Sequence, residues 1–430
     1  MGKVSPAREA AFASLNKMKY GRYSNLEVNA TLGHTRLGEE DRRLYTALVY
    51  GVTERLITLD YIISKYSNIP VANLDGETLC ALRLGIYQLC YMDRVPDHAA
   101  VSESVSLAGR RSGGFVNGVL RTFIRNDKKI PQPNFKTFAE NASVIYSLPQ
   151  PLCAMFEDWY GSAAAEKIFA AFEKREKICV HVNTLRLEAK KAAEMLGGRV
   201  SDICGDTVVC AGYAGIADGI ERGDWFVQDE ASALCAAALG AAPGDTVADC
   251  CAAPGGKSFA AAMAMENKGT VYALDIHKNK LSLIEKGAKK LGIDIICARE
   301  CDARRPDKSL VGKCRKVLCD APCSGLGIIG KKPDIRYKSP DDFSRLPEIQ
   351  YEVLCGASEY TAPGGTLVYS TCTLNPAENG EVCKRFLETH KDFSLQNFTV
   401  GGREYGAMTT LLPHIDGTDG FFICRMVRKA

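Results

Sequence analysis

Residues 249–258 are the most informative stretch of this sequence and read Asp249-Cys-Cys-Ala-Ala-Pro-Gly-Gly-Lys257-Ser258. The stretch directly follows a predicted strand (residues 246–250) and precedes a predicted helix (residues 258–266). Gly255 and Gly256 lack Cβ atoms, so the backbone there can come close to a ligand. In open α/β sheets, ligands bind at the carboxyl ends of the parallel strands. The stretch therefore predicts a ligand-binding turn at the edge of such a sheet.

Two common nucleotide-binding motifs do not fit this turn. A Walker A loop requires glycine at the position of Cys251. The dinucleotide-binding pattern G-x-G-x-x-G is absent as well. A purely structural turn is the remaining alternative, and the residues that follow the next strands argue against it.

Strand and helix patterns alternate after residue 243, which favours a doubly wound, mostly parallel sheet with right-handed crossovers. Beyond the strand at 246–250, further strands are predicted at residues 270–273, 293–298, 316–319 and 366–369.

An aspartate lies at or soon after the end of three of these strands: Asp275, Asp302 and Asp320. Carboxylates in these positions line one edge of a parallel sheet. The first is placed to accept both ribose hydroxyls and the second to meet the amine of an adenine, which indicates a nucleoside-containing cofactor. Any one of them alone is equally well explained as a helix cap.

Two of the 18 cysteines, Cys323 and Cys372, also follow core strands by a few residues. At that edge a thiolate can act as a nucleophile once a nearby cation or amide cluster lowers its pKa. Most cysteines in such a chain fill the core. Cys323 and Cys372 differ from them because they lie at the sheet edge beside Gly and Pro residues. No C-x-x-C pair is present, so reduced thiols and no metal site are predicted.

The length of 430 residues favours several domains, and 46% hydrophobic with 24% charged residues excludes a wholly disordered chain. Helical periodicity without strands predicts an all-α domain over residues 1–134, with a Pro-containing linker at 126–134. A small mixed α/β connector is predicted over residues 135–225, and the α/β domain over 226–430.

Charge and the first residues bear on location and partners. Residues 1–150 carry 19 Lys and Arg against 14 Asp and Glu, which weakly favours nucleic-acid binding by the front of the chain. Residues 1–20 contain four Lys or Arg side chains and no apolar segment. A cytoplasmic protein without membrane association is expected.

Three motifs in order resemble the NOL1/NOP2/Sun family of S-adenosylmethionine-dependent RNA cytosine-C5 methyltransferases. They are Cys251-Ala-Ala-Pro-Gly-Gly-Lys257, Asp320-Ala-Pro-Cys-Ser and Ser370-Thr-Cys-Thr. The stretches Lys331-Lys-Pro-Asp-Ile-Arg336 and Asn375-Pro-Ala-Glu-Asn-Gly380 fit as well, so the resemblance runs from about residue 145 to the end.

The front domain resembles the NusB RNA-binding module through Pro96-Asp-His-Ala-Ala-Val and Gly114-Phe-Val-Asn-Gly-Val-Leu-Arg121. Together, the two resemblances imply an all-α NusB-like domain, a connector and a Rossmann-like class I methyltransferase domain. They also imply methylation of a cytosine in 16S ribosomal RNA, either free or in a small-subunit assembly intermediate, by a monomer. The same chemistry on transfer RNA and a non-catalytic RNA-binding assembly factor are the alternatives.

The family resemblance implies a role for each site residue. Cys372 is the nucleophile that adds to C6 of cytosine, Asp320 binds the N3/N4 edge, and Cys323 assists loss of the C5 proton and enzyme release. In DNA C5 methyltransferases the Pro-Cys cysteine, here Cys323, is the nucleophile; the Thr-Cys-Thr motif favours the RNA assignment. S-adenosylmethionine is held at its ribose by Asp275, at its adenine by Asp302, and otherwise by Asp320 and the turn residues Cys251, Ala252, Ala253, Pro254, Gly255, Gly256 and Lys257.

Contacts with RNA phosphates are expected from six basic residues, although each alone is better explained as a solvated surface charge. These are Arg110, Arg111 and Arg121 in the front domain and Lys331, Lys332 and Arg336 near the site.

Overall fold

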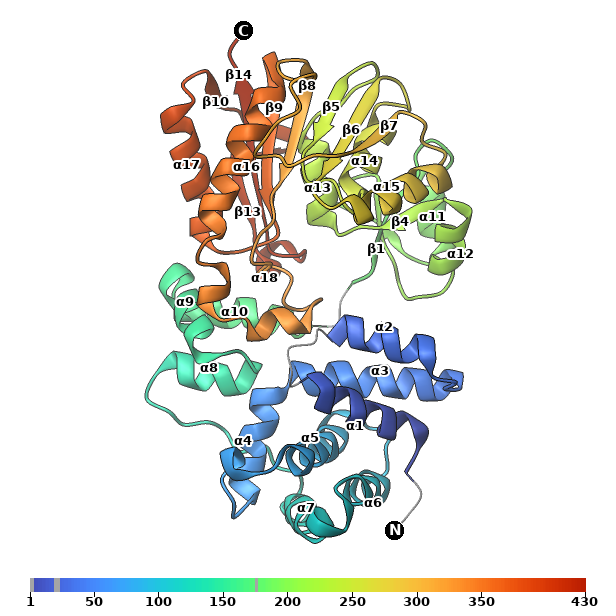
Figure 1. Cartoon of the computed structure of the whole chain (residues 1–430), viewed down its shortest axis with the longest axis vertical. Coiled ribbons are helices and arrows are strands. Elements are labelled where there is room, and N and C mark those ends of the chain that lie inside the picture. Colours follow the sequence, from blue (N-terminus) through green and yellow to red (C-terminus); the bar gives the residue numbers. More distant parts are fainter. Residues whose placement is uncertain (1–3, 19–23, 175–176) are drawn as a thin grey trace. The chain divides into compact units, whose positions relative to one another are not determined.

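The computed structural model describes residues 4–18, 24–174 and 177–430, which form two compact units (Figure 1). The helical unit comprises Met1–Glu173 with Lys331–Pro340, and the α/β unit comprises Lys174–Gly330 with Asp341–Ala430. The predicted three-part division, with boundaries after residues 134 and 225, stays a prediction. No helix in the three described ranges is long and apolar enough to cross a membrane.

The described part of the helical unit contains no strand, as the periodicity predicts. Its elements are α1 (Pro6–Met18), α2 (Ser24–His34), α3 (Glu39–Glu54), α4 (Leu56–Tyr66), η1 (Val71–Asn73), α5 (Gly76–Tyr91), α6 (Asp97–Leu107), α7 (Gly109–Arg125), α8 (Phe138–Tyr146), α9 (Gln150–Tyr160), α10 (Ser162–Phe172) and η2 (Pro333–Tyr337).

The core of this unit forms from the apolar positions that recur every three or four residues. Leu48, Leu59 and Ile62 are fully buried in one cluster drawn from α1 to α7. Local signals set helix starts: the Asp75 carboxylate accepts hydrogen bonds from two backbone N–H groups at the start of α5, and Thr137 closes a capping box at α8.

The segment η2 joins this unit although it comes late in the chain. The backbone N–H and hydroxyl of Ser24 donate to the two carboxylate oxygens of Asp334 at 3.0 and 2.8 Å. The Tyr337 hydroxyl accepts from the Leu56 N–H at 3.2 Å. Arg336 is 3% exposed and donates to the Tyr146 carbonyl at 2.9 Å. The expectation that Arg336 meets RNA phosphates is therefore wrong, because its guanidinium is buried within the helical unit.

The α/β unit begins with a small antiparallel sheet of order β2-β3-β1-β4. The predicted connector over residues 135–225 thus contains α8–α10 of the helical unit followed by this small sheet. Its strands and helices are β1 (Cys179–Val182), α11 (Ala189–Met195), β2 (Arg199–Val200), β3 (Thr207–Val209), α12 (Ile216–Arg222) and β4 (Trp225–Val227).

The large sheet has eight strands in the order β10-β14-β9-β8-β5-β6-β7, with β13 also paired to β14. All neighbours from β9 to β7 are parallel, as predicted, whereas β10, β13 and β14 form an antiparallel end that the sequence patterns had not indicated. The strands are β5 (Thr246–Asp249), β6 (Thr270–Asp275), β7 (Ile296–Glu300), β8 (Cys314–Asp320), β9 (Thr361–Thr371), β10 (Phe393–Leu395), β13 (Met408–Leu411) and β14 (Phe421–Arg428); β11 (Phe398–Val400) and β12 (Arg403–Tyr405) pair separately.

Helices cover both faces of this sheet, as in other doubly wound folds (Figure 1). Val247 and Leu318 face the core under α13, α14 and α15, while Ala248 and Cys319 face the core under α16 and α17. The helices are α13 (Glu230–Ala238), α14 (Gly256–Ala264), α15 (Lys278–Leu291), η3 (Pro340–Phe343), α16 (Leu346–Tyr360), η4 (Pro376–Glu378), α17 (Gly380–Thr389) and α18 (Pro413–Asp416). Because β5, β6, β8 and β9 run parallel, their carboxyl ends meet at one edge.

Candidate active site

The turn between β5 and α14 has a backbone that only glycine adopts easily. Gly255 has a φ of 113°, and a Cβ atom there would lie 2.5 Å from the Phe259 ring. The two adjacent thiols, for which the sequence offered no explanation, divide their roles. Cys250 is buried in the core, whereas Cys251 faces a pocket at the sheet edge.

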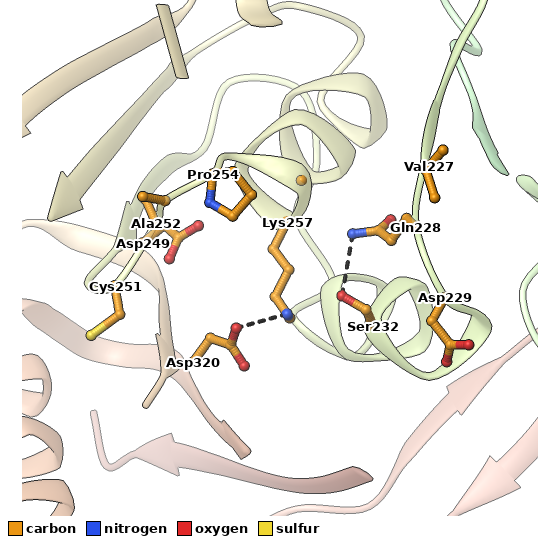
Figure 2. Close-up of a pocket in the computed structure, with 12 residues that line it drawn as sticks. Val227, Gln228, Asp229, Ser232, Asp249, Cys251, Ala252, Pro254, Lys257 and Asp320 are labelled. Atoms are coloured by element: carbon orange, nitrogen blue, oxygen red, sulfur yellow. Dashed lines mark hydrogen bonds and ion pairs between the residues drawn. The ribbon is translucent and has the colours of Figure 1, made fainter. Parts of the chain in front are cut away.

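The turn forms one wall of this pocket, and the segment between β4 and α13 forms another (Figure 2). The lining residues are Val227, Gln228, Asp229, Ser232, Asp249, Cys251, Ala252, Ala253, Pro254, Gly256, Lys257 and Asp320. Seven predicted cofactor residues are thus brought together here, while Gly255, Asp275 and Asp302 are outside the lining set.

Asp320 and Lys257 form an ion pair at the pocket (Figure 2). The Lys257 ammonium donates to one carboxylate oxygen of Asp320 at 2.7 Å, and the Ser370 hydroxyl donates to the other at 2.7 Å. Burial by itself lowers the pKa of Lys257, but the negative charge of Asp320, with weaker contributions from other groups, raises it overall. Asp320 is therefore oriented on both sides by donors.

Asp275, at the end of β6, holds the turn in place. Its carboxylate accepts hydrogen bonds from the backbone N–H groups of Ala253, at 3.1 Å, and His277, at 2.9 Å. Its side chain is largely buried. Its contact with a ribose stays a prediction.

Asp302 is paired with Arg304, whose guanidinium donates to both carboxylate oxygens at 3.0 and 2.8 Å. This hydrogen bonding lowers the pKa of Asp302. The contact of Asp302 with an adenine also stays a prediction, and an exocyclic amine would meet a carboxylate that Arg304 already occupies in part.

Four polar residues of the pocket were not predicted to have a role: Gln228, Asp229, Ser232 and Asp249. Asp249 is 1% exposed; one carboxylate oxygen accepts from the Ser258 hydroxyl at 2.6 Å, and the other has no partner within the described residues. The buried Gln228 carbonyl oxygen likewise has no partner among them. Asp249 lies at a strand end like Asp275, Asp302 and Asp320, and that signal could have singled it out, whereas Gln228 belonged to no motif.

These unsatisfied acceptors, the glycine turn and Lys257 fit a ligand that carries both an ammonium and a carboxylate. Buried acceptors require donors, which an ammonium supplies. Lys257 supplies a positive charge for a carboxylate. The methionine part of S-adenosylmethionine has both groups, so the residues present fit the implied cofactor.

Burial raises the pKa of Asp249 to about 7. Both states bind the proton below the ordinary pKa of about 3.9, and only the folded state keeps it up to about pH 7, so stability falls as pH rises between these values. We expect wild type to lose up to about 1.4 kcal/mol per pH unit more than Asp249→Asn between pH 5 and 7. Urea unfolding of both proteins across this range measures the difference, and equal slopes would contradict it.

The two thiols singled out in the sequence lie side by side. Cys323 follows β8, Cys372 follows β9, and their sulfur atoms are 3.3 Å apart. The contact with Cys372, together with burial, raises the pKa of Cys323 well above its ordinary value. Cys323 therefore keeps its proton at neutral pH.

The remaining basic residues are exposed, in contrast to Arg336. Arg110, Arg111 and Arg121 lie on α7, and Lys331 and Lys332 precede η2. Their contacts with RNA stay a prediction.

The mostly parallel sheet with a pocket at its carboxyl edge matches the Rossmann-like architecture expected for a class I methyltransferase. Comparisons with known proteins identify its kind. Residues 236–427 match the family model of the 16S rRNA methyltransferases RsmB/F, and residues 5–125 match that of the NusB family.

Whole-length relatives agree with these family matches. The chain is 37% identical to a probable ribosomal RNA small subunit methyltransferase B of Bacillus subtilis, over 99% of this chain and 100% of the relative. It is 30% identical to the ribosomal RNA small subunit methyltransferase B of Pectobacterium carotovorum, over 91% and 92%. A crystal structure of PH0851 superposes with a TM-score of 0.78 at 26% identity, covering 99% of both chains.

The chain belongs to the RsmB/F family of 16S rRNA methyltransferases. This membership confirms the resemblance that the three motifs indicated. It also confirms the predicted NusB-like front and Rossmann-like back.

Proposed function

We propose that this protein transfers a methyl group from S-adenosylmethionine to C5 of one cytosine in 16S ribosomal RNA, through a covalent bond between Cys372 and C6. The observation that carries the proposal is the 3.3 Å contact between the sulfur atoms of Cys323 and Cys372. These residues follow the adjacent strands β8 and β9 at the sheet edge where the pocket lies. One thiol is needed to attack the base and another to help release it, and both are present.

The chain's own residues account for the steps. C5 of cytosine is a poor nucleophile, and addition of the Cys372 thiolate at C6 makes it an enamine carbon. Asp320, oriented by Lys257 and Ser370, binds the N3/N4 edge and stabilises the charge that develops there. When bound, the cofactor supplies the electrophilic methyl group.

Product release requires two bonds to break. After methyl transfer the C5 proton leaves with the help of Cys323, and the electron pair of the C5–H bond re-forms the C5–C6 double bond as the bond to Cys372 breaks. The raised pKa of Cys323 disfavours its thiolate, which favours Cys372 as the attacking nucleophile. Cys323 can accept the C5 proton only after its thiol has lost its own proton.

The cofactor is held by the turn residues 251–257 at its methionine part, by Asp275 at the ribose and by Asp302 at the adenine. The NusB-like front binds RNA through its basic surface, including Arg110, Arg111 and Arg121. We further propose that the protein acts as a monomer in the cytoplasm. Its substrate is 16S rRNA or a small-subunit assembly intermediate.

Release of tritium tests the position of methylation directly. Unmodified 16S rRNA and transfer RNA, each made with [5-³H]cytidine, are incubated with the protein and S-adenosylmethionine. We expect tritium to enter water from 16S rRNA only, with one equivalent released per methyl group gained. Tritium release from transfer RNA alone would identify transfer RNA as the substrate. Binding of 16S rRNA without tritium release would favour a non-catalytic assembly factor.

A further inference from the structure

Glu378 is a buried carboxylate beside the two thiols, to which the proposed mechanism assigns no part. It ends η4 and is fully buried. Its carboxylate accepts hydrogen bonds from both the backbone N–H, at 2.8 Å, and the hydroxyl of Ser324. The side-chain amides of Gln350 and Asn375 donate to it at 2.9 and 3.0 Å. Four donors therefore converge on one carboxylate in a place without bulk water.

Three of these four donors, two from Ser324 and one from Asn375, belong to the loops that carry the thiols. Ser324 directly follows Cys323, and Thr373 directly follows Cys372. The hydroxyls of Ser324 and Thr373 are hydrogen-bonded to each other at 2.7 Å. The residue after each cysteine thus belongs to one network, whose centre is Glu378.

Further hydrogen bonds brace the same two loops. Gln350, which donates to Glu378 from α16, also donates to the carbonyl of Pro322, the residue before Cys323, at 2.9 Å. The Gly327 N–H donates to the Cys372 carbonyl at 3.0 Å. Hydrogen bonds between the two loops therefore restrain the backbone next to each thiol.

A network of this kind is rigid for energetic reasons. A buried carboxylate that loses its donors, or buried donors that lose their acceptor, remain unsatisfied at a cost of about 1–3 kcal/mol each. Because hydrogen bonds in a low-dielectric interior reinforce each other, small displacements of either loop are opposed by the whole network. The negative charge of Glu378 also raises the pKa of Cys323, but less than the contact with Cys372 and burial do.

We propose that Glu378 is a positioning residue that, through Ser324 and Thr373, fixes the distance between the Cys323 and Cys372 thiols. The consequence concerns two separate steps of the reaction. Attack on C6 requires only Cys372, whereas release of the methylated base requires Cys323 to be at the correct distance from the same ring. Loosening the network therefore slows release more than attack. This inference rests on the proposed covalent mechanism.

Single-turnover kinetics with unmodified 16S rRNA separate the two steps. The covalent protein–RNA species is quantified on denaturing gels against time, which gives a rate of formation and a rate of release. For Glu378→Gln we expect release to slow by about 100-fold relative to formation, since misplacement by about 1 Å costs that much. A variant that was only partly folded would form less of the covalent species, but the ratio of the two rates would be unchanged.

Matched variants keep the test decisive even if Glu378→Gln does not fold. Thr373→Ser keeps the hydroxyl that meets Ser324, and Thr373→Val replaces it with a methyl group of similar shape. We expect Thr373→Val to shift the ratio in the same direction and Thr373→Ser to retain the wild-type ratio. Glu348→Gln, at an exposed ion pair with Arg385, serves as the control on the neighbouring helix.

The outcomes distinguish this inference from the proposed function. If wild type forms and releases the covalent species while Glu378→Gln and Thr373→Val keep its ratio of rates, the positioning role is overturned and the mechanism stands. If wild type methylates RNA without any covalent species, the proposed mechanism fails and the inference fails with it. Cofactor affinity, measured by calorimetry, is expected to stay within about twofold of wild type in each folded variant, because the pocket does not include these residues.

Discussion

Cys372→Ala is expected to abolish both methyl transfer and the covalent protein–RNA species, and Cys323→Ala is expected to accumulate that species. The first change removes the sulfur that adds to C6, and loss of a nucleophile costs about a thousand-fold or more in rate. The second leaves attack possible and removes the group that helps the C5 proton to leave. Denaturing gels beside a methyl-incorporation assay on unmodified small-subunit RNA measure both results.

Cys210→Ala is the matched control, since Cys210 is a partly buried thiol of the small sheet outside the pocket and is expected to be replaceable without effect. If Cys323→Ala abolished methyl transfer and Cys372→Ala accumulated the covalent species, Cys323 would be the nucleophile. Full methylation by both variants would rule out thiol catalysis.

Asp320→Asn is expected to reduce kcat by about 100- to 1,000-fold, because the charge that stabilises the altered cytosine edge is lost. The substitution also removes the partner of Lys257, whose side chain is only 13% exposed. Removing one member of such a pair costs about 3 kcal/mol, so the free energy of unfolding should fall as well. Steady-state kinetics and urea unfolding measure the two effects separately.

The control for this substitution is Asp218→Asn, at an exposed aspartate of α12. It changes the same functional group without a buried partner, and both kcat and stability should match wild type. An Asp320→Asn protein with wild-type kcat would show that Asp320 binds only Lys257 and Ser370.

The parallel part of the sheet could be predicted because its signals are local. Strand β5, the glycine turn and α14 follow one another without interruption, so residues 246–266 contain the strand, the ligand-binding turn and the helix together. The same holds for the aspartates at strand ends, whose common edge follows from parallel topology alone. The short antiparallel strands β10 and β13 carry too few residues for an alternating pattern to be recognised.

The parts that escaped prediction depend on contacts between distant residues. Glu378 and Gln350 are 28 positions apart, and neither belongs to a periodic pattern that would indicate a shared network. Arg336 was expected to meet RNA phosphates, whereas its guanidinium is buried and donates to a carbonyl 190 positions away in the sequence. Composition and spacing contain no information on such pairs.

The excursion of residues 331–340 into the helical unit has a consequence for how the protein can be divided. A gene fragment that encodes residues 174–430 retains Asp334, Ile335 and Tyr337 but removes Ser24, Leu56 and the other groups that satisfy them. In such a fragment, Asp334, Arg336 and Tyr337 lose the partners that hold this segment in the helical unit. The two halves of the chain thus cannot be exchanged independently. A chimera between relatives must take residues 1–173 and residues 331–340 from the same parent.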